Sequence, residues 1–156
     1  MPSSMTLVGS QSTAASLTDT DLEIAAGTAA LLGVTRLRVS QSTHKTSEQY
    51  QIKAQRITTT GTGTSTTPLI KEPQTAALGA ARIGTCKTVD TVEPTYTAST
   101  ILIQANVNSL TGRDIPFPPG QELWISPAAI LGCAVITPAG TTTATYDFES
   151  EFYALG

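Results

Sequence analysis

The clearest pattern along the chain is an alternation of apolar and polar residues close to its C-terminal end. Ala144, Tyr146, Phe148 and Phe152 share one parity, and the residues between them are polar or acidic. A period of two predicts a β-strand with one face in a core and the other against water or a charged partner, as in antiparallel sheets. The acidic side chains of that second face are Asp147, Glu149 and Glu151.

Seven further segments carry strand signals of varying strength. In residues 34–39, Leu37 and Val39 oppose Arg36 and Arg38, which predicts an amphipathic strand with two cations on its outer face. Residues 21–32 alternate at first but are rich in alanine, so a helical turn is an alternative to the preferred strand. The other predicted strands are residues 48–57, 81–89, 100–109, 123–125 and 131–136.

About eight strands without a regular alternation of strand and helix predict an all-β domain, an antiparallel β-sandwich or jelly roll. Residues 1–20 are rich in Ser and Thr and show no sustained period, so we expect an N-terminal arm that a partner orders. Residues 21–156 are expected to form a single β-sandwich (jelly-roll) domain. Residues 58–79 are expected to be a long surface excursion, because the Thr-rich stretch offers little apolar surface and Pro73 interrupts the rest.

The composition narrows the class of partner. Only 13% of the 156 residues are charged and 5% are aromatic, whereas 28 are threonine, a β-branched residue that suits partly covered strands. A net charge of -3 with 40% hydrophobic residues opposes disorder. Nine Lys and Arg without a basic stripe argue against nucleic-acid binding, and neither a membrane span nor a secretory signal is recognisable. So little surface charge favours self-association, and we expect a homotrimer.

The sequence offers little for catalysis. The single histidine, His44, lies in a polar segment beside Lys45, where a solvated side chain is the usual role. Serine-nucleophile and phosphate-loop motifs are missing, and Gly61-Thr62-Gly63 stands alone in a Thr-rich stretch. We therefore expect neither an enzyme nor a bound cofactor.

The acidic face of residues 144–152 has two interpretations. Calcium would need roughly six to eight oxygen ligands, and hence a second contributor besides Asp147, Glu149 and Glu151. A solvated or ion-paired strand face is the favoured alternative, with Arg36 and Arg38 as the complementary pair, either within one sheet or across a subunit boundary.

Trp124 and the two cysteines complete the set of candidate residues. Trp124 has the opposite parity to Leu123 and Ile125, so it is expected either to face outward as an interface anchor or to cap the core edge beneath Phe117. Cys86 and Cys133 are expected to be two buried thiols rather than a disulfide, because no secretory signal accompanies them.

The order of features between residues 34 and 152 resembles the jelly-roll decoration, or cement, proteins on the heads of tailed bacteriophages. The resemblance is one of turn residues and strand pattern. The residues that carry it are Glu93-Pro94-Thr95-Tyr96-Thr97, the apolar strand from Ile101 to Val107, Gly112-Arg113, Pro118-Pro119-Gly120-Gln121-Glu122-Leu123, Leu131-Gly132 and the closing alternating strand.

The resemblance implies a structural virion protein on the capsid exterior, made in the host cytoplasm. It would bridge neighbouring copies of the major capsid protein against internal DNA pressure, without catalysis. Such proteins are often trimers, and a trimer of jelly rolls buries a central seam. Tyr146 or Phe148 are the candidates for that seam. The other interface candidates are Trp124, because of its parity, and the charged residues of the two complementary strand faces, Arg36, Arg38, Glu149 and Glu151.

Two alternatives come from other classes of protein. A receptor-binding or carbohydrate-binding jelly-roll module of a virion or a secreted protein would present exposed aromatic residues and carboxylates on loops, and the chain is poor in aromatic residues. A cupin-type enzyme would need several histidine ligands, whereas His44 is the only histidine.

Overall fold

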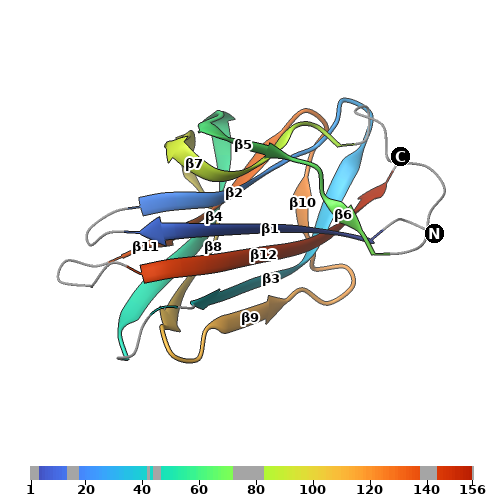
Figure 1. The fold of residues 1–156 in the computed structure, drawn as a ribbon. Helices are drawn as coiled ribbons and strands as arrows, with labels where there is room; N and C mark the ends of the chain where they lie inside the picture. Colours follow the sequence, from blue (N-terminus) through green and yellow to red (C-terminus); the bar gives the residue numbers. More distant parts are fainter. Residues whose placement is uncertain are drawn as a thin grey trace.

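The structure, a computed structural model, describes residues 4–13, 18–41, 43, 47–71, 83–137 and 144–155. These ranges contain twelve β-strands and no helix. Within them, accordingly, no helix is long and apolar enough to cross a membrane. The strands form two antiparallel sheets that lie over each other (Figure 1), which confirms the all-β, sandwich-like class.

The first sheet has β3 and β12 at its centre, with β1 beside β12 (Figure 1). β3 has β12 on one side, while two short strands, β10 and β9, follow one another along its other side. The order is β10 (Leu123–Ile125), β3 (Leu31–Gln41), β12 (Ala144–Leu155), β1 (Ser4–Thr13) and β6 (Leu69–Ile70), and β9 (Arg113–Pro116) also pairs with β3.

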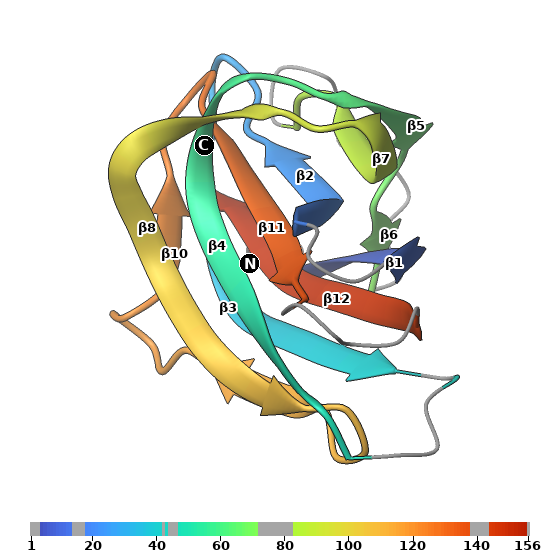
Figure 2. The ribbon, with the colours of Figure 1, turned by 90° about the vertical axis from the view of Figure 1, so that its left-hand side faces the viewer.

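The second sheet is built around β2, β11 and β4, and β8 forms its outer border (Figure 2). Its edges are β5 on one side and β8 on the other. The order is β5 (Thr62–Thr66), β7 (Cys86–Val92), β2 (Thr18–Ala25), β11 (Ile130–Ile136), β4 (Gln49–Thr59) and β8 (Thr95–Asn108).

The core lies between the sheets and confirms the predicted parity of the last strand. Along β12 the buried side chains are Ala144, Tyr146, Phe148 and Phe152, together with Ser150 and Ala154 of the same parity. Tyr146 packs against Tyr50 of the second sheet, with ring centroids 4.6 Å apart. The helical alternative for residues 21–32 is wrong, since Thr18–Ala25 and Leu31–Gln41 are strands.

A β-bulge in each sheet, one on β3 and one on β2, shifts the alternation of buried and exposed residues. On β3, Arg36 lies opposite Glu151 while Val34 lies opposite Phe152, so Thr35 is the extra residue. Val34 and Leu37 are therefore both buried although they have opposite parity. On β2, Asp21 is the extra residue, because Leu22 lies opposite Cys133 and Thr20 opposite Ala134.

The predicted N-terminal arm is wrong. Residues 4–13 form β1, which is paired with β12 over its whole length and with β6 at its start. Met5 and Leu7 have 0% and 1% of their surface exposed and belong to the core. The strand went unpredicted because its inward positions continue with Gly9 and Gln11, which end the apolar alternation after two residues.

The predicted surface excursion at 58–79 is exposed at most of its described residues, as predicted, but it contains two strands rather than only loop. Residues 62–66 form the edge strand β5, paired with β7, and Leu69–Ile70 pairs with β1 in the other sheet. The segment thus passes from one sheet to the other at their common edge. Residues 72–79 lie outside the described residues. The described ranges contain twelve strands rather than the predicted eight, because β1, β5, β6 and β9 were not predicted.

Candidate interaction surfaces

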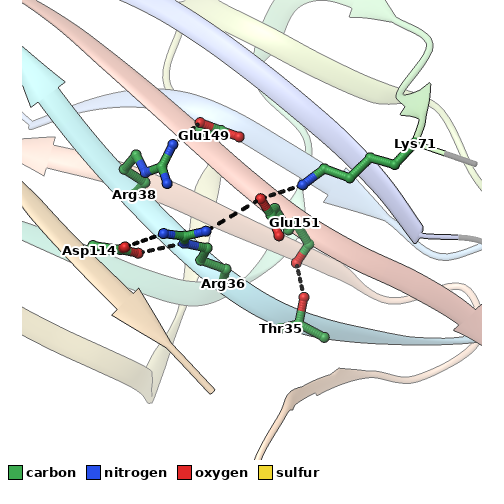
Figure 3. A network of polar contacts seen from close by, with 7 residues as sticks. All are labelled: Thr35, Arg36, Arg38, Lys71, Asp114, Glu149 and Glu151. Atoms are coloured by element: carbon green, nitrogen blue, oxygen red, sulfur yellow. Dashed lines mark hydrogen bonds and ion pairs between the residues drawn. The ribbon is translucent and has the colours of Figure 1, made fainter. Parts of the chain in front are cut away.

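The charged face predicted from sequence is an ion-pair network on the outer face of the first sheet (Figure 3). The register of β3 and β12 sets Arg38 opposite Glu149 and Arg36 opposite Glu151. The nearest nitrogen–oxygen distances are 3.2 Å for Arg38–Glu149 and 3.8 Å for Arg36–Glu151. The predicted pairing is therefore confirmed, and it lies within one sheet of one chain.

The network extends to both neighbours of the central strands. Arg36 is bidentate to Asp114 of β9, with Nε 2.7 Å from Oδ1 and a second contact from Nη2 to Oδ2. Lys71, just after β6, contacts the Oε1 atom of Glu151 that also faces Arg36. The Arg36 guanidinium holds the pKa of Asp114 below its usual value.

The charges of this network cancel within the chain. The network joins the cations Arg36, Arg38 and Lys71 to the carboxylates of Asp114, Glu149 and Glu151 (Figure 3), so the face is polar without a single sign. Exposed pairs of this kind each contribute at most about 1 kcal/mol. Among the described residues, no group of three or more His, Cys, Asp and Glu side chains is arranged to hold a metal ion, and Glu149 and Glu151 face cations instead.

The Arg38–Glu149 pair should couple weakly. We expect a double-mutant cycle with Arg38→Ala and Glu149→Ala to give an interaction energy of about 0.3 to 1 kcal/mol in urea melts, because both side chains are partly solvated. The coupling should shrink further in about 1 M salt, where the screening length is about 3 Å. A coupling that persists unchanged in salt would contradict this account.

Trp124 lies on the outer face of the first sheet, as one of the two expectations had it. Its ring makes an edge contact with Tyr153 at 6.0 Å between centroids. Both rings lie over Gly33, where a Cβ would come within 2.9 Å of Tyr153 and 3.0 Å of Trp124. The Tyr153 hydroxyl donates to Glu122 at 3.2 Å. Trp124 is thus partly covered, and its role as an interface anchor stays a prediction.

Tyr146 and Phe148 are not available to a partner. Each has 0% of its surface exposed within a single chain, so neither can line a trimer seam. Their proposal as seam residues is therefore wrong, because their alternation with acidic residues reflects the core of the chain itself.

The second sheet offers an edge that the pattern of side chains did not reveal. β8 has β4 on one side and, among the described residues, no strand on the other. Its sequence, TYTASTILIQANVN, contains no charged residue and no proline. Leu102 is the extra residue of a bulge between Ile101 and Ile103, and Ile101 and Leu102 are 48% and 37% exposed. The Arg113 side chain donates to the Asn106 carbonyl at 3.0 Å, which leaves residues 101–105 as the free part of the edge.

The start of β8 is fastened to the outer face of the second sheet by polar contacts. Glu93 accepts hydrogen bonds from the Thr20 backbone at 3.0 Å and the Thr20 hydroxyl at 2.5 Å. The Tyr96 hydroxyl lies 2.5 Å from the same Thr20 oxygen, and the Lys53 ammonium lies 3.9 Å from the Tyr96 ring centroid. Tyr96 also covers Gly132, where a Cβ would come within 2.9 Å of the ring. The segment around Glu93-Pro94-Thr95-Tyr96-Thr97 therefore has a structural role within the chain.

The remaining candidates behave as follows. Cys86 and Cys133 are unpaired and buried, as predicted, and burial raises the pKa of both thiols, that of Cys86 to about 11. His44 lies outside the described residues.

Comparison of the chain with protein-family models, with characterised proteins and with solved structures finds no match.

Proposed function

We propose that the chain is a jelly-roll virion protein that decorates and stabilises a bacteriophage capsid by bridging neighbouring capsid subunits, without catalysis. The fold part of this proposal rests on the pairing of eight strands. The functional part rests on the free edge of β8 together with the resemblance of residues 34–152 to head decoration proteins.

A jelly roll is a long antiparallel ribbon of four strand pairs that wraps into two sheets. Eight strands of this chain, taken in sequence order, are β1, β2, β3, β4, β8, β10, β11 and β12. The first pairs with the eighth, the second with the seventh, the third with the sixth and the fourth with the fifth. This nested order supports the jelly roll, with β5 to β7 inserted between the fourth and fifth members. Because jelly rolls also occur in lectins and cupins, the fold alone does not decide the function.

The free edge of β8 is the observation that carries the function. Unpaired N–H and C=O groups of an edge strand are a template for an added strand, and natural proteins usually protect them with charge, proline or cover. Residues 101–105 carry neither charge nor proline and present the side chains of Ile101 and Leu102 to solvent. The occupant that fits is an extended segment of a neighbouring capsid subunit, held by main-chain hydrogen bonds and two apolar contacts.

A homotrimer remains part of the proposal. The seam residues proposed from sequence are excluded, so the trimer contact would use exposed apolar positions instead, such as Val8 and Leu69, which are 51% and 72% exposed on β1 and β6. The contact would add to the attachment by supplying three β8 edges to one capsid site, which raises the effective concentration of each.

Undecorated heads of the same virus test the proposal directly. We expect the purified chain to co-sediment with them saturably, as a trimer by light scattering, and to raise the temperature at which the heads rupture. Binding without saturation, or no effect on rupture, would count against a decoration role. If the chain is monomeric at micromolar concentration and still stabilises the heads, the decoration role stands and only the proposed homotrimer is rejected.

One observation favours the carbohydrate-binding alternative as the second candidate. The partly covered rings of Trp124 and Tyr153 lie beside the Glu122 carboxylate, which is the combination of ring and acceptor that sugar sites use. Binding of immobilised glycans that is lost in Trp124→Ala, with no binding to heads, would select this function over the first.

A further inference from the structure

Two acidic side chains are buried against each other at the β5 edge of the second sheet. Glu23 of β2 and Asp90 of β7 are 0% and 3% exposed, and both carboxyl groups lie against Gly61, Glu23 by a hydrogen bond from its backbone N–H and Asp90 by close packing. Glu23 lies opposite Lys87 in the β2–β7 register. Two ionised carboxylates at this depth would repel each other and lack the water that normally solvates them.

The hydrogen-bond donors around this pair do not suffice for two ionised groups. Glu23 Oε1 accepts from the Gly61 backbone at 2.6 Å, and Glu23 Oε2 lies 3.7 Å from the Lys87 ammonium. Glu23 Oε2 and both carboxyl oxygens of Asp90 are buried without a hydrogen-bond donor among the described residues. Since an ionised carboxylate only accepts, a proton held between the two acids would supply the missing donor.

The stretch that looked like an isolated GxG motif encloses the Asp90 carboxyl. A Cβ at Gly63 would come within 2.1 Å of Asp90 Oδ1, and one at Gly61 within 2.8 Å of Oδ2. The two glycines therefore let the chain that enters β5 close over Asp90, which explains both of them without a ligand. The Lys87 ammonium donates to the Gly61 carbonyl at 2.5 Å and holds the same turn.

The pair also connects the two sheets. The Gln11 side-chain amide of β1 donates to the Asp90 backbone carbonyl at 3.1 Å. The contacts of Glu23 and Asp90 thus join β2 and β7 to the start of β5 and to β1 of the first sheet.

We propose that Glu23 and Asp90 form a proton-operated clamp that fastens β5 to the second sheet, closed when the pair shares one proton and loosened when both carboxyls are ionised.

The direction of the pH effect follows from the surroundings. Burial raises the pKa of Asp90 to about 7, and the hydrogen bond and charge of Glu23 and the charge of Glu93 act in the same sense, while Lys87 opposes them. Asp21 of β2 is a further acid within electrostatic reach of Asp90, and the described strands β1 and β5 contain no ionisable side chain. Because the folded state holds this proton more tightly than the unfolded state, where the pKa is about 3.9, the contribution of this pair to stability is greatest at acid pH and falls as pH rises from about 4 to about 7.

The test is the pH dependence of unfolding and of amide exchange in wild type, Asp90→Asn and the control Asp147→Asn, which removes a carboxylate from the outer face of the first sheet. For one linked proton, the unfolding constant of wild type should rise up to about tenfold per pH unit between pH 5 and 6.5 relative to Asp90→Asn. The control should keep the wild-type slope. Amides of Thr62–Thr66 should lose protection over the same range in wild type, beyond the intrinsic change in exchange rate, and not in Asp90→Asn.

The clamp would be rejected if the unfolding constants of wild type and Asp90→Asn had the same pH dependence. It would also be rejected if the pH dependence differed but the β5 amides kept the same protection from exchange. Glu23→Gln provides a second route if Asp90→Asn does not fold. A glutamine keeps an oxygen for the Gly61 N–H but removes the acid that shares the proton, so the slope should be smaller than in wild type, while the burial of Asp90 preserves part of it. A wild-type slope in Glu23→Gln would equally reject the proposal.

Discussion

Deletion of residues 1–13 is expected to abolish cooperative folding. The deletion removes β1, which lies between β12 and β6 and is paired with β12 along its whole length. It also removes Met5 and Leu7 from the core, each worth about 1.5 to 3 kcal/mol of burial, and a ladder of hydrogen bonds worth about 1 kcal/mol each. Their sum is comparable with the entire net stability of about 5 to 15 kcal/mol of an ordinary domain.

Near-UV circular dichroism and thermal melts measure this outcome. The truncated chain should show no cooperative transition and should aggregate, because the edge of β12 becomes free for pairing with other chains. The matched control is a deletion of residues 1–3, which leaves β1 intact. If the chain without residues 1–13 melts cooperatively, close to the full chain, then residues 1–13 are an arm and the role of β1 in the folded domain is contradicted.

Phe148→Ala is expected to lose about 3 to 5 kcal/mol of unfolding free energy. Phe148 has 0% of its surface exposed and lies on β12 between Gly9 of β1 and Val39 of β3, so alanine would leave a cavity at the centre of the first sheet. Glu149→Ala, one residue further on the outer face, should lose no more than about 1 kcal/mol.

Urea melts of the two variants compare the faces of β12 directly, at one fixed protein concentration so that dissociation is not counted as unfolding. Similar losses for the two variants would mean that the outer carboxylates contribute far more than ion pairs at the surface do. Calcium dependence of the Glu149→Ala melt would then be the next quantity to measure.

The strands that sequence predicts well are those whose buried positions are filled with large apolar residues. β12 keeps one parity from Ala144 to Ala154, so both its buried face and its acidic face were predicted. Arg36 and Arg38 could be matched to Glu151 and Glu149 because an amphipathic strand with cations and one with carboxylates are complementary.

Two of the strands that were missed, β1 and β5, have small or polar residues at positions that pack against neighbouring strands. On β1, Gly9 is required because a Cβ would come within 2.4 Å of the Asp21 carbonyl on β2, yet it removes an apolar signal from the pattern. On β5, Gly63 is required for the same reason, because a Cβ there would come within 2.1 Å of the Asp90 carboxyl. In both places the cause is a residue distant in sequence, which local periodicity does not report.

The free edge and the buried acids were also beyond the sequence pattern. Alternation shows which face of β8 is covered, but not that β8 lies at the border of the sheet, which depends on strand order. Asp90 and Glu23 are acidic residues of a kind that sequence patterns assign to the solvated surface. The pairing of β2 with β7 and the turn at Gly61 bury them.

The measurement closest to the central claim is the affinity for undecorated heads of Leu102→Lys and Ile101→Lys, with Leu155→Lys as the control. All three residues are apolar and exposed, with 37% of the surface of Leu102, 48% of Ile101 and 40% of Leu155 accessible to solvent. Leu155, however, ends β12 in the other sheet. A lysine at the β8 edge places a charge in the path of an added strand, so binding should weaken by about tenfold or more, a change of about 1.4 kcal/mol, without loss of folding. The control should bind like wild type. Unchanged binding of both β8 variants, or an equal loss in the control, would contradict attachment through this edge.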